Sequence, residues 1–150
     1  MRVREFQSEI WLPLPPAKLF PFFCDAANLD ALTPPWLHFQ IVTPRPIEMR
    51  TGMLIDYKLR VRGLPLRWRT IIRHWQPPLY FVDEQLRGPY RQWIHTHTFE
   101  PRDGGTLARD TVQYAVWLDF IVHPLFVRRD IQKIFAFRQV ALRDKFGGKA

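Results

Sequence analysis

The sequence holds a single cysteine and no long apolar run, and both absences exclude classes of protein. Cys24 cannot form an internal disulfide, which excludes a small secreted module held together by disulfides. No window approaches about 18 consecutive uncharged apolar residues, so no membrane-spanning segment is expected. The first residues, 1–6, lack the uninterrupted apolar core of a signal peptide. The default expectation is therefore a cytoplasmic protein.

Signature motifs of several enzyme classes are also missing. There is no Gly-x-Ser-x-Gly element, and Cys24 lies at the end of an expected helix without an obvious histidine partner. Neither a phosphate-binding glycine loop nor a dinucleotide-binding fingerprint is present. The sequence therefore implies no cofactor, and we assign no catalytic residue from motifs.

Large aromatic rings are what the sequence has in abundance. Aromatic residues make up 15% of the 150 residues, with 6 tryptophans and 12 phenylalanines, whereas the hydrophobic share of 47% and the charged share of 24% are ordinary. A chain of this length buries roughly two thirds of the surface that it exposes when unfolded. We therefore expect a single domain over residues 1–150, with a core rich in rings.

The chain is strongly basic, with a formal net charge of +8 and a pI of about 10.2. Such a charge raises nucleic acid as a partner. The arginines are scattered, however, and no motif of a helix-turn-helix, zinc finger or single-strand-binding module is present. We expect no nucleic-acid binding and interpret the charge as a solvated outer sheet face. Weak contact with an anionic membrane surface stays open as an alternative.

Prolines and changes of hydrophobic period divide the chain into elements. Residues 3–11 are expected to form a strand, and Pro15-Pro16 opens a helix because proline suits the first helical turn. Asp25 is expected to cap a second short helix, 26–32, which Pro34-Pro35 ends. Beyond it, alternation of apolar and polar residues predicts about six strands, at 37–41, 55–62, 67–73, 80–86, 91–99 and 106–117.

The last third of the chain changes to a helical period. Apolar residues recur at spacings of three and four from Val127 to Phe146, Pro124 fits the first turn, and Gly147-Gly148 ends the pattern. The expected helix, 124–146, is roughly 34 Å long. It is the only element long enough to cover the apolar face of a meandering antiparallel sheet. We therefore predict an α+β fold in which a curved seven-stranded sheet wraps a long C-terminal helix, with a cavity between them.

Several stretches of the chain match a family pattern in the same order. They are Phe22-Phe23-Cys24-Asp25-Ala26-Ala27-Asn28-Leu29, Leu32-Thr33-Pro34-Pro35, Gly52-Met53-Leu54-Ile55-Asp56-Tyr57, Trp68-Arg69-Thr70, Pro77-Pro78-Leu79-Tyr80-Phe81-Val82-Asp83-Glu84-Gln85, Gly88-Pro89-Tyr90, Trp93-Ile94-His95-Thr96-His97-Thr98-Phe99, Gly104-Gly105-Thr106 and Ile134-Phe135-Ala136-Phe137-Arg138. With these the chain resembles the START-like, or SRPBCC, superfamily, and within it the small bacterial ligand-binding proteins related to polyketide cyclase/dehydrases. The resemblance implies the helix-grip fold, with two short helices after the first strand. It implies function only coarsely, because members bind lipids, sterols, quinones or polyketides and some are enzymes.

The strand that contains His95 and His97 is the most informative segment. A period of two puts both histidines on one face with Trp93 and Phe99, so that face is expected to point inward. Three interpretations follow: two core histidines held by neighbours, a polar patch that contacts a ligand, or a metal-ligand pair. A metal would need a third ligand from Asp83, Asp110 or His74, and the resemblance implies no metal.

Other polar residues fall on faces that are expected to be apolar. Asp83 and Gln85 share a strand face with Phe81, and Asp110 shares one with Tyr114, so each is either a buried group that needs a partner or a strand-end group in water. Arg138 interrupts the apolar stripe of the last helix. Either an aspartate or an acidic ligand group neutralises it, or its head reaches the solvent at the rim.

We predict from these patterns that the protein binds a hydrophobic or polycyclic small molecule, such as a lipid, a quinone or a polyketide-like compound. The alternative is a cyclase or dehydratase-like enzyme in which His95 or His97 acts as general acid or base. A histidine nitrogen that lines an open cavity and is held by an acid would favour catalysis. The predicted ligand-binding residues are Tyr57, Trp68, Phe81, Asp83, Gln85, Trp93, His95, His97, Phe99, Asp110, Tyr114, Phe135 and Arg138.

Overall fold

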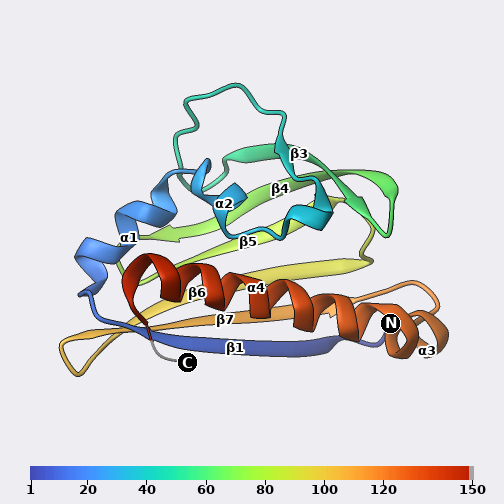
Figure 1. Ribbon diagram of the computed structural model, residues 1–150. Helices are drawn as coiled ribbons and strands as arrows, with labels where there is room; N and C mark the ends of the chain where they lie inside the picture. Colours follow the sequence, from blue (N-terminus) through green and yellow to red (C-terminus); the bar gives the residue numbers. More distant parts are fainter. Residues whose placement is uncertain (149–150) are drawn as a thin grey trace.

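Seven antiparallel strands form one curved sheet around the C-terminal helix in the computed structural model, which describes residues 1–148 (Figure 1). The strand order across the sheet is β1-β7-β6-β5-β4-β3-β2, so all neighbours except β1 and β7 are consecutive in the chain. The strands are β1 (Arg4–Leu12), β2 (Gln40–Ile41), β3 (Leu54–Val61), β4 (Leu64–Gln76), β5 (Tyr80–Arg87), β6 (Gln92–Arg102) and β7 (Gly105–Ala115). The predicted α+β helix-grip fold is confirmed.

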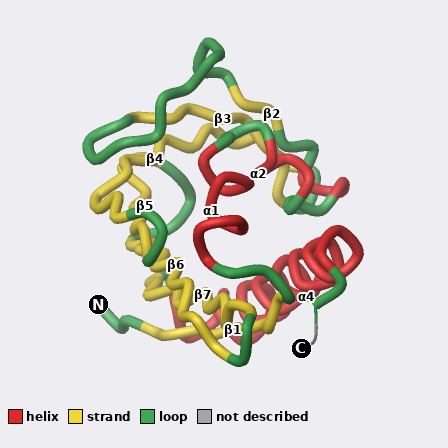
Figure 2. The backbone as a smooth tube through the Cα atoms, turned by 90° about the vertical axis from the view of Figure 1, so that its left-hand side faces the viewer, coloured by secondary structure: helices red, strands yellow, loops and turns green. Residues whose placement is uncertain are grey.

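Short helical elements follow β1 and fill one end of the curved sheet (Figure 2). They are α1 (Pro16–Cys24), α2 (Asn28–Ala31) and the 3₁₀ turn η1 (Pro35–Leu37). The carboxylate of Asp25 accepts a hydrogen bond of 2.9 Å from the backbone N–H of Ala27 in the turn before α2. The prediction that Asp25 caps this helix is wrong, because the N-cap residue is Ala27 and no side chain among residues 1–148 caps the helix. The helix predicted over 26–32 is shorter than expected, since only 28–31 are α-helical.

The C-terminal helix begins earlier than the sequence pattern predicts. The chain is helical from Asp119, through α3 (Asp119–Val122) and the π-helical turn η2 (His123–Val127), and continues as α4 (Arg128–Phe146). Pro124 lies inside η2 instead of opening the helix. A proline has no N–H to donate, and the wider π turn accommodates that missing bond without ending the helix. The helix ends at Gly147 in the left-handed conformation, as predicted.

Two clusters of buried side chains hold the sheet to the helices. Phe20 and Leu19 of α1 pack with Leu12 in the first cluster. Ile131 and Phe135 of α4 pack with side chains of β7 in the second cluster. No helix in residues 1–148 combines the length and the apolar character required to cross a membrane. Members of both clusters, among them Phe23 and Phe135, also line the cavity described below.

Candidate ligand-binding cavity and its polar cluster

A cavity of about 800 Å³ lies between the concave face of the sheet and α4. Its size is within the range of roughly 300–1,000 Å³ that is usual for small-molecule sites. Strands β3 to β6 supply one wall and α4 the other, while α1, α2 and η1 close the end. Most of the wall is apolar, and its large side chains include Phe22, Phe23, Trp36, Phe39, Tyr57, Trp68, Phe81, Trp93, Ile134 and Phe135.

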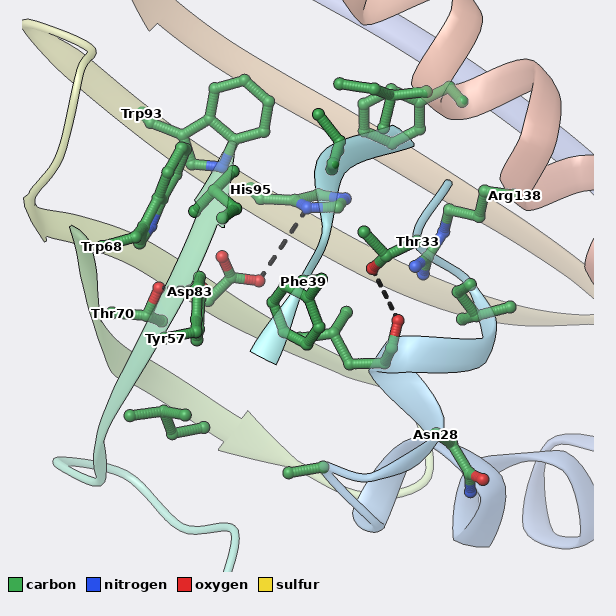
Figure 3. Close-up of a pocket in the computed structure, with 18 of the residues that line it drawn as sticks. Asn28, Thr33, Phe39, Tyr57, Trp68, Thr70, Asp83, Trp93, His95 and Arg138 are labelled. Atoms are coloured by element: carbon green, nitrogen blue, oxygen red, sulfur yellow. Dashed lines mark hydrogen bonds and ion pairs between the residues drawn. The ribbon is translucent and has the colours of Figure 1, made fainter. Parts of the chain in front are cut away.

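Part of the polar lining of the cavity, its two histidines and Asp83, gathers at one place on the wall (Figure 3). His97 Nε2 donates a hydrogen bond of 2.6 Å to Asp83 Oδ2, and His95 Nε2 donates one of 2.8 Å to Asp110 Oδ1. His95 Nδ1 lies 3.9 Å from Asp83 Oδ2. The strand register puts His95 opposite Asp83 and His97 opposite Asp110, because β6 lies between β5 and β7. Each hydrogen bond therefore joins a histidine to its diagonal neighbour on the same face of the sheet, not to the residue directly opposite.

Arg138 reaches this group of side chains, which we call the polar cluster, from α4 (Figure 3). Its Nε donates a hydrogen bond of 3.1 Å to Asp110 Oδ2, and its Nη2 lies 3.4 Å from His97 Nδ1. Arg138 is buried, so its charge requires a partner there. An internal aspartate supplies that partner, which decides between the alternatives left open by the sequence. A bound ligand does not need to carry a negative charge to neutralise Arg138.

Aromatic stacking fixes the orientation of the two imidazoles. The ring of His97 lies between Phe81 and His95, with centroid distances of 3.9 Å and 3.7 Å. Trp93 and Phe135 contact His95 edge-on. Because the rings cannot rotate freely, each histidine keeps one nitrogen on its carboxylate. The remaining nitrogen of His95, Nδ1, makes no hydrogen bond within residues 1–148.

The surroundings of His95 and His97 move their pKa values in opposite directions. Burial and the neighbouring charge of His97 lower the pKa of His95, and the bond to Asp110 offsets this only in part. Burial also acts to lower the pKa of His97, but its contacts with Asp110 and Asp83 outweigh burial and raise the pKa of His97 above its ordinary value. His97 therefore takes a proton more readily than His95 does.

The carboxylates of the polar cluster stay ionised although they are enclosed. Burial acts to raise the pKa of Asp110, but the charge of Arg138 and the bonds to both histidines bring that pKa well below its usual range. Asp83 behaves similarly, since burial is outweighed by the bond to His97 and by the positive charges nearby, and its pKa is lowered. Two ionised carboxylates thus face the positive charge of Arg138 and the two imidazoles, of which His97 takes a proton more readily.

Nine of the thirteen residues predicted to bind ligand line the cavity: Tyr57, Trp68, Phe81, Asp83, Trp93, His95, His97, Phe135 and Arg138. The hydroxyl of Tyr57 is hydrogen-bonded to Thr70, and burial raises the pKa of Tyr57, so the phenol remains neutral. The prediction that strand alternation turns these tryptophans and histidines toward a hollow interior therefore agrees with the geometry.

The other four lie outside the lining. Gln85 exchanges hydrogen bonds with the backbone of Tyr90 and so holds the β5–β6 turn. Phe99 packs against Phe20 and Phe23 in the core and does not line the cavity. Tyr114 donates or accepts a hydrogen bond of 2.8 Å with His123, and Asp110 lies behind the histidines that it orients.

The sequence patterns missed the segment that closes the cavity from outside the sheet. Asn28, Thr33, Trp36 and Phe39 line the cavity from α2, η1 and the loop that follows. Thr33 and Phe39 lie close to the polar cluster in Figure 3. No periodicity could identify these residues, because irregular loops have none. The only available signal was the pair of prolines before Trp36, which indicates a rigid turn.

Three side chains of the polar cluster have the composition of a metal site. Ligand atoms of Asp83, His95 and His97 all lie within 4.8 Å of one another. Of the three candidates considered for a third ligand, Asp83 belongs to this group and His74 does not. Asp110 also contacts both histidines, at 2.8 Å from His95 Nε2 and 3.3 Å from His97 Nδ1. In this arrangement Asp83 Oδ2 and His97 Nε2 are hydrogen-bonded to each other, and Arg138 adds a positive charge beside them.

Comparison with known proteins agrees with this geometry. Residues 12–136 match the sequence model of the family described as polyketide cyclase / dehydrase and lipid transport. A search of curated proteins gives no match. The match runs from the last residue of β1 into α4 and includes all the residues that line the cavity except Arg138.

Solved structures similar to the chain extend over nearly all of it. Protein CV1439 from Chromobacterium violaceum has a TM-score of 0.71 at 15% identity and covers 95% of this chain and 97% of its own. Ara h 8.0201 has a TM-score of 0.64 at 21% identity, with 95% and 99% covered. The major latex-like protein 151 of Panax ginseng has a TM-score of 0.65 at 7% identity, with 92% and 96% covered. At these identities the likeness concerns the fold.

Proposed function

Because the chain belongs to the polyketide cyclase / dehydrase and lipid transport family, we propose that it binds one hydrophobic or polycyclic small molecule, of lipid, quinone or polyketide type, inside the cavity. The observation that carries the proposal is a cavity of about 800 Å³ with aromatic walls and a single polar cluster. Apolar walls with a few well-placed polar groups are typical of small-molecule sites. Residues 1–150 act as one ligand-binding domain in this proposal.

The polar cluster indicates which ligand groups fit. Asp110 already accepts a hydrogen bond from Arg138, so an uncharged ligand suffices at the polar cluster. Hydroxyl and carbonyl oxygens suit the side chains that face the cavity, because Arg138 and Tyr57 can donate hydrogen bonds and His95 Nδ1 can accept one. A polycyclic ketone, phenol or quinone combines such oxygens with flat rings that stack on Trp68 and Trp93.

Native mass spectrometry of the protein purified from its own host tests the proposal. We expect the wild-type protein to retain a small molecule, and Leu59→Trp, which fills the cavity from β3, to lose it. The control is Leu54→Trp, the same substitution on an exposed residue of the same strand that does not line the cavity. Binding of 1-anilinonaphthalene-8-sulfonate should weaken about tenfold or more in Leu59→Trp. The indole fills space in the cavity, so the dye loses a large apolar contact with the wall.

Circular dichroism shows whether both variants are folded. A wild-type protein that carries no small molecule, and that binds the dye no better than a folded Leu59→Trp does, would overturn the proposal.

A second candidate function, acid–base catalysis of a cyclisation or dehydration, is favoured by one specific observation. His95 and His97 line the cavity, each is held by a carboxylate, and their pKa values are pushed apart. Pairs of titratable groups separated in this way commonly divide the roles of acid and base. We propose that His95 Nδ1 takes the proton as base and returns it as acid, because it makes no hydrogen bond within residues 1–148, whereas both nitrogens of His97 face Asp83, Asp110 or Arg138. Asp110 and Asp83 would orient them.

Turnover of a poly-β-ketone thioester analogue separates this candidate from binding alone. We expect His95→Gln to lower kcat by about 10²–10⁴-fold, the usual contribution of a positioned base, while the affinity for the analogue stays within a few-fold. His74→Gln, on β4 and outside the cavity lining, is the matched control. If the wild-type protein binds the analogue but does not convert it, catalysis is excluded and the protein only binds its ligand.

A further inference from the structure

The end of the molecule formed by α3 and η2 exposes a patch of large apolar side chains. We call this patch the apolar tip; its members are Trp117, Leu118, Phe120, Ile121, Leu125 and Phe126. Phe120 is 75% exposed, and none of the six is less than 42% exposed. Figure 1 places α3 at the far end of the molecule from the C-terminus. Contiguous apolar side chains of this size on a surface usually mark an interaction site.

Basic side chains surround the apolar tip. The guanidinium of Arg91 lies 4.7 Å from the ring centroid of Trp117, and that of Arg62 lies 4.7 Å from the ring centroid of Phe126. Arg128 and Arg129 follow the tip directly in the chain and are exposed. The surface therefore combines insertable rings with cations at their edge.

The acidic residues near the tip are already neutralised. Asp119 forms two hydrogen bonds of 2.9 Å with Arg4, and Asp130 forms a salt bridge of 2.8 Å with Arg62. Arg91, Arg128 and Arg129 take part in no ion pair within residues 1–148. The surroundings of the apolar tip thus carry a net positive charge.

The apolar tip adjoins the rim of the cavity. Arg62, which stacks on Phe126, also lines the cavity, as do Gly63 on the same turn and Asp130 and Lys133 at the start of α4. The Arg62–Asp130 pair connects the β3–β4 turn to α4 at this position. A partner that contacts the tip therefore lies next to the rim.

We propose that the apolar tip docks on an anionic lipid bilayer, with the six apolar side chains in the interface and the arginines on lipid phosphates. Exposed tryptophan and phenylalanine next to arginine are the side chains that favour the boundary between headgroups and acyl chains. Each basic side chain near an anionic surface strengthens binding roughly fivefold. Docking in this orientation brings the rim of the cavity to the membrane, whichever molecule the cavity holds.

Charge distinguishes the bilayer from other partners. A second copy of the chain, related by a twofold axis, would bring Arg91 and Arg128 of both copies close to one another, and like charges oppose such a contact. A nucleic acid would match the arginines but would leave the apolar side chains without a partner. An anionic bilayer matches both features.

Flotation with vesicles tests the proposal. We expect the wild-type protein to float with vesicles of phosphatidylcholine and phosphatidylglycerol, to bind vesicles of phosphatidylcholine alone more weakly, and to be released by added salt. Phe120→Ser should reduce the partition coefficient about tenfold or more, because one exposed ring no longer inserts. The control is Leu79→Ser at the β4–β5 turn, since Leu79 is 54% exposed but lies outside the tip.

Sedimentation velocity and thermal unfolding complete the test. Phe120→Ser should unfold at the wild-type temperature, because the side chain makes little contact with the core. The proposal is overturned if the wild-type protein does not float, if Phe120→Ser floats as well as wild type, or if salt has no effect. A wild-type dimer that Phe120→Ser converts to a monomer, without vesicle binding, would overturn it in favour of self-association.

Discussion

Asp110→Ala is expected to lower the free energy of unfolding by about 3–5 kcal/mol, the cost of leaving a buried charge without its partner. Asp110 accepts hydrogen bonds from His95 and Arg138 and lies 3.3 Å from His97 Nδ1. Its removal leaves the guanidinium of Arg138 enclosed beside two imidazoles. Urea denaturation followed by circular dichroism measures the change.

Asp56→Ala is the matched control for Asp110→Ala. Asp56 is likewise paired with an arginine, since it lies 2.8 Å from Arg69 on the neighbouring strand. The side chains of Asp56 and Arg69 are, however, 41% and 43% exposed. An exposed pair contributes up to about 1 kcal/mol. If both variants lose a similar small amount, the polar cluster does not depend on Asp110. The double variant Asp110→Leu/Arg138→Leu should recover part of the loss, because it leaves neither charge unpaired.

Phe20→Ala is the second substitution with a large expected effect, a loss of about 3–5 kcal/mol in the free energy of unfolding. Phe20 is 2% exposed and contacts Trp75, Phe81 and Phe99 edge-on. Alanine would leave a void among rings that cannot collapse into it. Because Phe20 anchors α1 at the end of the cavity, dye binding should weaken as well.

Phe120→Ala provides the comparison for Phe20→Ala. The same atoms are removed, but Phe120 is on the surface, so its free energy of unfolding should stay within about 0.5 kcal/mol of wild type. Thermal and urea unfolding of the two variants give the difference directly. Equal losses in both would mean that α1 is not held by the contacts of Phe20.

The strands and the inward side chains were predictable because both follow from a period of two. Trp93, His95 and His97 needed no information beyond alternation and the apolar neighbours that mark the buried face. The helical period of the last third of the chain predicted the covering helix, and the resemblance to a known family added the helix-grip fold. The long β3 to β7 strands leave little freedom in where their side chains point.

The pairing of the polar side chains was not predictable from the same patterns. Asp110 lies opposite His97 but is hydrogen-bonded to His95, its diagonal neighbour. A single sequence specifies neither the register between β6 and β7 to one residue nor which of the two neighbours the side chain bonds to. The early start of the C-terminal helix at Asp119 was missed for a local reason. Pro124 is typical of a first turn, whereas here a π turn accommodates it within the helix.

The location of the polar cluster in the sheet has a consequence for how relatives of this chain can diverge. Asp83, His95 and Asp110 come from β5, β6 and β7, each of which is hydrogen-bonded to a neighbouring strand on both sides. Arg138 comes from α4. The apolar walls near Trp36 and Phe39 come instead from loops at the edge. Substitutions and insertions in those loops can change the shape of the cavity without disturbing the polar cluster. The ligand that fits can therefore change during evolution while the polar contacts stay the same.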